Sequence, residues 1–427
     1  MKAKALAIEI SPPSEVELGA ADAGNAPWLG LSEPIEANLL ALWPEDDGMP
    51  LLMISIDLLY PGRMLRKVAE DAAPGLDSSH IFFAATHTHR APMTDDTKPL
   101  LGSPDASYMD WISRELASAV ERVLDPDGAE PCRLVAGQAT ADHSINRRLK
   151  KKFFLARRPL INAFMNAPNK RGTTDETIIV ASVENAEGEP IAFAWNYACH
   201  PVGYPKLNTV AAHFPGVVRD AIRASESSDD LPVLYFQGFS GNTRPSASAR
   251  VHSVGRTIRR LLSGPLFEDM TGAAYREWAG SLSRLVLTAA ANGREVSSEP
   301  LAAVRIEVEG SKFASTLQED VSFHGVTIGR ELALVAVSGE AVVEYTPLVR
   351  EMSTAEFTLC VGCIDHTFGY IPTTRIIEEG GYEAGNFCRS FGLESVNPQI
   401  QEHVLAGFEQ VVNGGRVNAE KGELQTP

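Results

Sequence analysis

Two histidines separated by one residue stand at the end of an apolar run, in the segment FFAATHTHRAP. If a β-strand continues through this segment, side chains two residues apart point to the same face, and His87 and His89 point together beyond the strand end. Imidazole is a frequent ligand of zinc. The pair therefore predicts either a metal site or two polar side chains in an exposed loop.

Two further segments end an apolar run in a residue that can bind metal. His200 occurs in NYACHPVG, and Glu340 in VSGEAVVE. Folds of the α/β class place their sites beyond the carboxyl ends of strands. Catalytic zinc takes three protein ligands and keeps a position for water. These two residues could join His87 and His89, although a glutamate at a strand end is often a solvated carboxylate.

The elements that must hold these residues follow from the apolar pattern. Short apolar runs predict buried strands at 51–57, 80–86, 233–236 and 332–340. A further run, TIIVASVENAEGEPIAFAWNYA, predicts two strands joined by a turn. Helical spacing predicts helices at 64–73, 108–124 and 273–292, with another beginning at Pro215. We expect one α/β domain over residues 1–413 and a polar, frayed tail over 414–427.

Composition restricts the functional class. The chain has 427 residues, 44% of them hydrophobic, and a formal net charge of −17, which disfavours a nucleic-acid partner. It contains no uninterrupted signal-peptide core and no apolar window long enough to cross a bilayer. Five cysteines are too few for a disulfide framework. We expect a cytoplasmic protein that acts on a small molecule, without a membrane partner.

Five motifs occur in the order found in neutral ceramidases: THTHRAP, NYACHPVG, FQGFSGNTRP, VSGE, and GYIPTTR followed by EGGYEA. From about residue 50 to residue 390 the chain therefore resembles the ceramidase-like superfamily. The resemblance implies the fold of the catalytic domain, a mixed β-sheet core layered with helices. We expect no C-terminal β-sandwich domain.

The resemblance also implies a metal site. It implies one zinc ion per chain, held by four residues: His87, His200, Glu340 and Tyr370. His89 would then contact substrate or water. Without the resemblance, Tyr370 would be interpreted as a tyrosine packed in a turn. Arg147, in INRRLK, matches a family arginine that could orient a carbonyl or an oxyanion.

The departures from the family pattern concern the substrate pocket. Arg244 stands where the family has its catalytic serine, Arg90 where it usually has a serine, and His213 where it usually has an aspartate. We therefore expect zinc-activated water as the nucleophile and a small anionic or polar substrate instead of ceramide. Asn242 and His366 are expected to line the same pocket. The alternative for His213 is an ordinary loop histidine.

Two other motifs have competing interpretations. The segment CVGCIDH resembles half of a zinc knuckle, but no second CxxC accompanies it, so reduced, partly buried cysteines are expected. Residues 147–158 carry seven basic side chains, which predicts a solvated loop or helix face that could attract an anionic substrate. Phe153, Phe154 and Leu155 could anchor this segment on the body or on a second subunit, so homo-oligomerisation stays open.

These residues together predict a zinc-dependent amidohydrolase. Arg147 and Tyr370 would stabilise the developing oxyanion. His89, with His213 or His366 in reserve, would carry a proton to the leaving amine. Hydrolysis of an ester or lactone would use the same residues. A non-catalytic zinc- or ligand-binding homologue, and a lyase or isomerase with His89 as its base, are the remaining alternatives.

Overall fold

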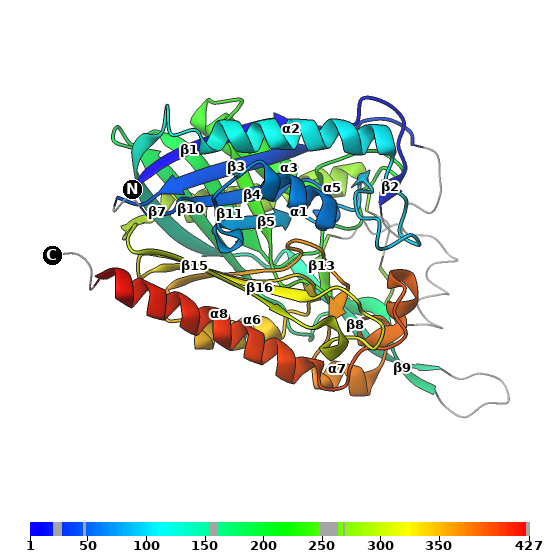
Figure 1. Cartoon of the computed structure of the whole chain (residues 1–427). Coiled ribbons are helices and arrows are strands. Elements are labelled where there is room, and N and C mark those ends of the chain that lie inside the picture. The colour runs from blue at the N-terminus through cyan, green and yellow to red at the C-terminus, as the bar shows by residue number, and fades with distance from the viewer. Residues whose placement is uncertain (20–27, 46–47, 154–160, 248–263, 268–269, 424–427) are drawn as a thin grey trace.

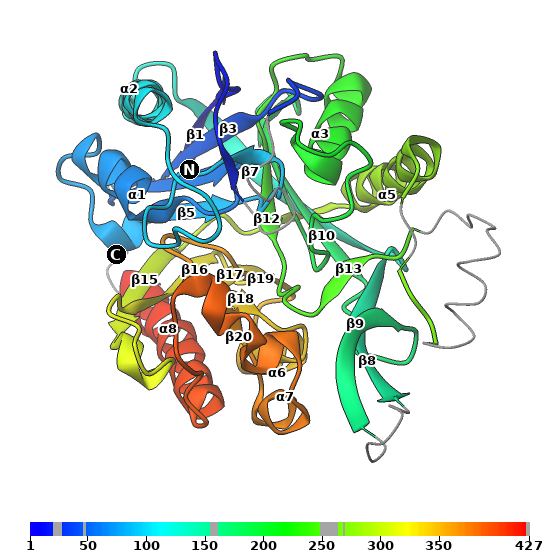
Figure 2. The ribbon, with the colours of Figure 1, turned by 90° about the vertical axis from the view of Figure 1, so that its right-hand side faces the viewer.

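The computed structural model describes residues 1–423 except 20–27, 46–47, 154–160, 248–263 and 268–269. Two β-sheets pack face to face, and helices cover the outer face of each sheet (Figures 1 and 2). The order of the layers is helix, sheet, sheet, helix. The expected fold class, a mixed sheet layered with helices, is confirmed.

The larger sheet has the strand order β12-β11-β10-β7-β1-β3-β4-β5, with β14 paired to β7. Its strands are β1 (Lys2–Glu9), β3 (Glu36–Trp43), β4 (Leu51–Ile56), β5 (Ile81–Ala85), β7 (Glu130–Thr140), β10 (Thr177–Asn185), β11 (Pro190–Tyr197), β12 (Val233–Gln237) and β14 (Arg294–Val296). The pairs β4–β5 and β11–β12 are parallel and the other pairs are antiparallel.

The larger sheet curls, so that its edge strand β12 meets β4 and β5. The Ser55 hydroxyl on β4 donates to the Tyr235 carbonyl at 2.7 Å and accepts from the Tyr235 amide at 3.1 Å. Phe82 of β5 meets Phe236 of β12 edge to face, with ring centroids 5.3 Å apart. The carboxyl ends of β5, β11 and β12 are thereby brought to one side of the molecule.

The smaller sheet has the order β15-β16-β17-β19. Its strands are β15 (Leu301–Val308), β16 (Val321–Ile328), β17 (Leu332–Val337) and β19 (Phe357–Val361). Strands β17 and β19 are parallel. Side chains such as Leu40 and Met53 from the larger sheet share one core with Leu334 and Leu359 from the smaller. Strands β4, β5, β17 and β19 are buried along their whole length, which explains their uninterrupted apolar runs.

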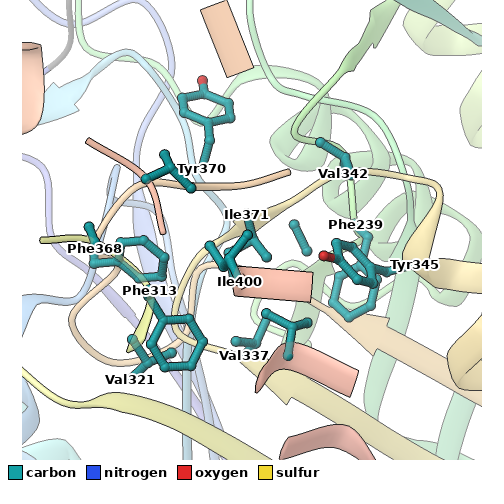
Figure 3. Packing of buried hydrophobic residues seen from close by; sticks show 14 of the residues in the cluster. Phe239, Phe313, Val321, Val337, Val342, Tyr345, Phe368, Tyr370, Ile371 and Ile400 are labelled. Carbon is teal, nitrogen blue, oxygen red and sulfur yellow. The ribbon is translucent and has the colours of Figure 1, made fainter. Parts of the chain in front are cut away.

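Helices α1 (Gly62–Asp71), α2 (Ala106–Leu124), α3 (His213–Glu226) and α5 (Gly272–Ala291) pack on the outer face of the larger sheet. Helices α6 (Tyr345–Met352), α7 (Thr374–Glu379) and α8 (Ile400–Glu423) lie on the side of the smaller sheet. Figure 3 shows the core beneath them, a single cluster of buried side chains that includes Phe313, Val337, Tyr345 and Ile400.

Short elements complete the side of the molecule where the strands end. Strands β8 (Ser144–Phe153), β9 (Ile161–Asn169) and β13 (Thr243–Pro245) form a separate sheet, while β18 (Glu340–Ala341) pairs with β20 (Tyr370–Ile371) and β2 (Leu18–Gly19) pairs with β6 (Ala91–Pro92). The remaining short turns are η1 (Ser78–His80), η2 (Gly310–Lys312), η3 (Tyr382–Asn386) and η4 (Cys388–Phe391).

The basic run at 147–158 differs from its prediction. Its first half forms strand β8, and Arg147, Arg148 and Lys151 are buried rather than solvated. One buried carboxylate, that of Glu383, forms ion pairs with both arginines. This contact joins distant segments of the chain, so a local sequence pattern does not reveal it. Residues 154–160, including Phe154, Leu155 and the last two arginines of the run, lie outside the described residues.

The expected start of the C-terminal tail falls inside a helix. Helix α8 continues through position 414 to Glu423, so no secondary-structure element ends at the expected start of the tail. A Cβ atom at Gly414 would lie 3.1 Å from Val304, so the helix is packed on β15 at this point. Residues 424–427 lie outside the described part of the chain. All five cysteines are free thiols. No helix in the described ranges is sufficiently long and apolar to cross a bilayer.

Candidate metal centre

The parallel strand pairs of the two sheets place their carboxyl ends together. The loops that follow β5, β12, β17 and β19 are joined there by backbone hydrogen bonds. The Gly362 amide donates to the Gln237 carbonyl at 2.9 Å, and the Ala85 amide donates to the Cys363 carbonyl at 3.0 Å. The Cys363 amide donates to the Gly339 carbonyl at 3.2 Å. A common edge of this kind is where α/β folds hold their sites.

Three histidines converge at this edge. The Nε2 atom of His200 lies 3.1 Å from Nε2 of His87 and 3.0 Å from Nε2 of His89. His87 and His200 are fully buried, while His89 is partly exposed. Strand β5 ends at Ala85, and His87 has a φ of +63°. The expected alternation along a strand is therefore wrong, because a tight turn brings the two histidines together.

The hydrogen bonds of the rings indicate which nitrogens carry protons. His87 Nδ1 lies 3.0 Å from the Leu59 carbonyl, and His200 Nδ1 lies 3.4 Å from the Ser240 carbonyl. Because a carbonyl only accepts, each Nδ1 carries the hydrogen in the neutral ring, and each Nε2 presents a lone pair. Burial, followed by the neighbouring His87 and Arg147, holds the pKa of both His200 and His89 well below its ordinary value. Neutral lone pairs that face one another at this distance fit a shared cation.

Glu340 points a carboxylate at the same position. Its Oε1 accepts from the Tyr60 hydroxyl at 2.7 Å. Its Oε2 lies 3.5 Å from His87 Nε2 and 3.8 Å from His200 Nε2, with no regular hydrogen bond from the described residues. Burial opposes ionisation, but His87 and the hydroxyls of Tyr370 and Tyr60 hold the pKa of Glu340 below its usual range. The carboxylate is thus ionised and could bind a metal cation.

His87 faces negative partners. Burial lowers the pKa of His87, but the Cys363 thiol and the Glu340 carboxylate outweigh it and raise that pKa well above its ordinary value. The surroundings of His87 therefore favour positive charge. Nitrogen ligands of a tetrahedral zinc ion lie roughly 3.3 Å apart, close to the separations found here. The donor set fits a metal of the zinc type.

Tyr370 lies beside Glu340 through the parallel pairing of β20 with β18. Its hydroxyl oxygen accepts from Nη2 of Arg147 at 3.1 Å. Burial and the Glu340 carboxylate raise the pKa of Tyr370 well above its ordinary value, whereas Arg147 lowers it. A metal cation would also lower it. The structure thus brings together the four predicted ligands, and His89 with them.

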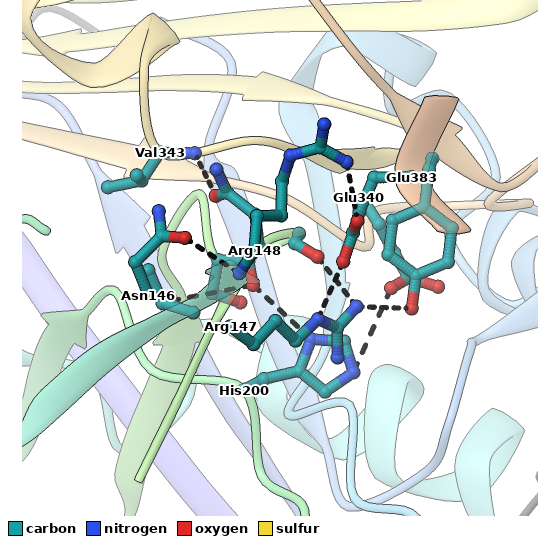
Figure 4. A network of polar contacts seen from close by, with 12 residues as sticks. Asn146, Arg147, Arg148, His200, Glu340, Val343 and Glu383 are labelled. Atoms are coloured by element: carbon teal, nitrogen blue, oxygen red, sulfur yellow. Dashed lines mark hydrogen bonds and ion pairs between the residues drawn. The ribbon is translucent and has the colours of Figure 1, made fainter. Parts of the chain in front are cut away.

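Arg147 reaches the centre from β8. Its Nη2 also donates to the Gly241 carbonyl at 2.7 Å, and its backbone amide donates to the Asn242 carbonyl at 2.8 Å. Figure 4 shows its guanidinium beside His200 and Glu340. It lies where a substrate carbonyl at the metal could accept a charged hydrogen bond.

Arg90 and Arg244 both lie near His213, and Arg90 and His213 lie near His89. His213 is fully buried with a φ of +62°, and its Nδ1 accepts from the Phe214 amide at 2.8 Å. Burial, followed by Arg90 and Arg244, lowers the pKa of His213 to about 3, so the ring is neutral. Its Nε2 therefore carries the hydrogen, and this donor meets no acceptor among the described residues. Arg90 and His213 also lower the pKa of His89, which places them at the centre.

Arg244 projects from β13 towards the loop after His200. Its Cζ atom lies 4.2 Å from the ring centroid of Phe267. A Cβ atom at Gly203 would lie 2.8 Å from Arg244 Nη2, so the glycine leaves room for the guanidinium.

Two predicted substrate contacts, Asn242 and His366, are hydrogen-bonded to the protein itself. The Asn242 side chain donates to Glu344 at 2.7 Å and accepts from the Val343 amide at 2.9 Å, so its polar atoms are already engaged by the protein. His366 Nε2 lies 2.5 Å from the Asp320 carbonyl. It lines a separate recess of about 160 Å³, which contains none of the metal-site residues.

Sequence reasoning missed three residues of the centre. Tyr60 binds Glu340, but a tyrosine within the apolar run DLLYP gave no functional signal. Cys363, with a φ of +57°, lies beside His87. Glu383 pairs with Arg147 at 2.8 Å, and the YEA motif that contains it was the available signal.

Two solved structures of ceramidases are similar to this chain in fold. A crystal structure of neutral ceramidase from Pseudomonas aeruginosa superimposes with a TM-score of 0.76, covering 98% of this chain and 74% of the other. A ceramidase complexed with C2 gives a TM-score of 0.75 and covers 98% and 75% of the two chains. The fold is that of neutral ceramidases. Sequence identity to both is 14%, so the likeness establishes the ceramidase fold alone. No protein-family model and no curated protein matches the chain by sequence.

Proposed function

We propose that the chain is a zinc-dependent amidohydrolase that cleaves a C–N bond in a small polar or anionic acyl compound. One observation carries this proposal. The Nε2 atoms of three histidines, from the loops after β5 and β11, gather within the ceramidase fold, and the ionised Glu340 carboxylate lies 3.5 Å from that of His87. Such a donor set suits zinc, and a partly exposed member is typical of a catalytic rather than a closed structural site.

We assign the metal to His87, His200, Glu340 and Tyr370, as the resemblance implies. When bound, zinc would polarise a substrate carbonyl and lower the pKa of a water molecule. His89 lies as close to His200 as His87 does. On distance alone, His89 could therefore bind either the metal or the substrate. Its partial exposure favours the substrate side.

Arg147 and His89 carry the chemistry that the chain itself supplies. The Arg147 guanidinium, fixed on Gly241 and Tyr370, would donate to the oxygen on which negative charge develops. His89 would pass a proton to the leaving amine, because it is the accessible imidazole of the centre. His213 suits donation of a hydrogen bond better than proton transfer, since its Nδ1 already accepts from the Phe214 amide.

The substrate class follows from the group next to His89. Arg90 and Arg244 place two cations there, and the Nε2 hydrogen of His213 adds a buried donor. A carboxylate or phosphate on the acyl compound would be attracted by the two cations and could accept the His213 hydrogen. Arg244 also removes the hydroxyl that ceramidases carry at this position, which favours water as the nucleophile.

The test compares an amide and an ester of the same anionic acyl group. Purified protein is freed of metal, reloaded with zinc and assayed on both substrates. Zinc-dependent cleavage of the amide, abolished by a chelator, supports the proposal. Cleavage of the ester alone would make the protein an esterase. Zinc binding without turnover across an acyl library would favour a non-catalytic binding protein. The arginine at the position of the family serine is the feature that suggests this alternative.

A further inference from the structure

Arg147 and its neighbour Arg148 share one buried carboxylate, that of Glu383. Nε of Arg147 donates to Glu383 Oε1 at 2.8 Å, and Nη1 of Arg148 donates to Oε2 at 2.9 Å. The side chains of all three residues are nearly inaccessible to solvent. Figure 4 shows Glu383 approaching the arginines from the side of the smaller sheet.

The guanidinium of Arg147 is held at two edges. Glu383 binds its Nε edge, while Nη2 donates to the Gly241 carbonyl and the Tyr370 hydroxyl. A guanidinium is planar, so bonds at two of its edges fix its rotation as well as its position. With the Glu383 contact absent, one edge alone would hold it.

Glu340 competes for the same guanidinium. It is an anionic neighbour that acts electrostatically on Arg147, and its Oε2 accepts no regular hydrogen bond from the described residues. A buried cation that loses its partner turns to another anion, because an unpaired buried charge is unfavourable. Arg147 would then engage Glu340 and occupy a carboxylate that the metal needs.

We propose that Glu383 is a positioning residue, which holds Arg147 against Tyr370 and away from Glu340. It acts on the reaction only through Arg147 and touches neither metal nor substrate. The kinetic part of this inference rests on the proposed hydrolase function. The structural part, the orientation of Arg147, does not.

An unusual backbone conformation places the Glu383 carboxylate beside Arg147. Glu383 lies in η3, which follows Gly380 and Gly381 and contains Gly385, three glycines with φ values of +73°, +105° and +154°. This turn also packs Tyr382 edge to face against Tyr370, with ring centroids 5.2 Å apart. The carboxylate therefore reaches Arg147 from a chain segment whose conformation depends on glycine.

The kinetic experiment uses Glu383→Gln, which keeps the size of the side chain and removes its charge. We expect kcat for the amide to fall about 10- to 100-fold with a smaller change in KM, the usual effect of losing an outer partner of a site. Glu379→Gln is the matched control. Glu379 pairs with Arg148 at 3.2 Å in the same network, and no hydrogen bond joins it to Arg147 in the described part of the chain, so wild-type kcat is expected.

A double-mutant cycle separates positioning from general stabilisation. In an Arg147→Ala background, Glu383→Gln should cause no further loss of kcat/KM, because its effect passes through the missing arginine. Equal losses in the wild-type and Arg147→Ala backgrounds would overturn the proposal.

A spectroscopic experiment tests the orientation of Arg147 without any substrate. In ¹⁵N-labelled protein, the Nε hydrogen of Arg147 should exchange slowly with solvent, and Glu383→Gln should abolish this protection while Glu379→Gln preserves it. Retained protection in Glu383→Gln overturns the inference even if the enzyme is active. Glu383→Asp keeps the charge but is one methylene shorter, so it must also lose the protection of the Arg147 Nε hydrogen. This variant replaces Glu383→Gln if the glutamine variant fails to fold. Lost protection in a protein without amidase activity would support the positioning and reject the proposed function.

Discussion

At the scale of residues, His87, His200 and Glu340 are buried polar groups arranged in a way that folding alone does not favour. Two imidazole Nε2 atoms lie 3.1 Å apart, and a carboxylate oxygen beside them has no regular hydrogen bond from the described residues. Buried polar atoms are normally satisfied, so such an exception calls for a specific cause. A cation among these atoms supplies that cause and offsets their mutual repulsion.

Arg244 makes the substrate class testable. Replacing it with serine removes a charged hydrogen bond worth about 1.5–3 kcal/mol, so KM for an anionic acyl substrate should rise about 10- to 150-fold. A neutral analogue should be affected less. Arg122→Ser, which removes an exposed cation at the end of α2, is the control. Steady-state kinetics that are unchanged in Arg244→Ser would exclude an anion contact at this position.

His324 gives a prediction about pH. It is fully buried on β16 with Nε2 2.6 Å from the Ser79 carbonyl, and burial lowers its pKa to about 3. The unfolded chain binds a proton at this histidine below about pH 6.5, and the folded protein does not. The stability that depends on neutral His324 is therefore complete above pH 6.5 and is lost as pH falls.

Between pH 7 and pH 5 this single group should remove about 2 kcal/mol of unfolding free energy. His324→Gln keeps an N–H donor but does not titrate, so its unfolding free energy should fall about 2 kcal/mol less than that of the wild type over this interval. Urea unfolding at the two pH values measures the difference. Parallel losses in both proteins would show that His324 is protonated in the folded state.

At the scale of elements, the site depends on strands that could be predicted and on turns that could not. The apolar runs indicated β4, β5, β12 and β17, because strands buried on both faces have uninterrupted apolar sequences. His200 and Glu340 could be identified because each follows such a run. The turn at His87 and the pairing of Glu383 with Arg147 could not, since each depends on contacts between distant segments.

The basic run shows the limit of local reasoning most clearly. Charged residues in sequence usually indicate a solvated surface, and Arg147 and Arg148 are instead buried in strand β8. Their partner, Glu383, lies more than 200 residues away in the chain, 236 from Arg147. Only the family resemblance singled out Arg147 from its neighbours.

Gly381 tests the turn that carries Glu383. Its φ is +105°, and a Cβ atom there would lie 3.2 Å from both Arg148 Nη1 and the Phe164 carbonyl. Gly381→Ala should therefore lower the unfolding free energy by about 1–3 kcal/mol, through backbone strain. Gly280→Ala is the paired control, because this glycine lies within α5 with open space around it. It should stabilise by about 0.4–1 kcal/mol, and thermal unfolding measures both. Equal effects at the two positions would contradict the strain.

At the scale of the whole molecule, two sheets share one core, and this core holds the carboxyl ends of their strands close together. Phe236 packs in this core against Phe82, between the edges of the curled sheet. Phe236→Ala should lower the unfolding free energy by about 3–5 kcal/mol, because a large buried ring leaves a cavity. Leu100→Ala, at a side chain that is 66% exposed, should change it by less than about 0.5 kcal/mol. Similar values for the two variants in urea unfolding would refute this packing.

We propose that the strand ends of both sheets together form one catalytic metal site. The most direct test measures bound zinc and amide hydrolysis together, in the wild type and in His200→Ala. We predict one zinc ion per wild-type chain and hydrolysis that disappears with a chelator and returns with zinc. His200→Ala should fold, lose the zinc and lose the activity. Full zinc content in His200→Ala, or wild-type hydrolysis that is indifferent to metal removal, would contradict the account.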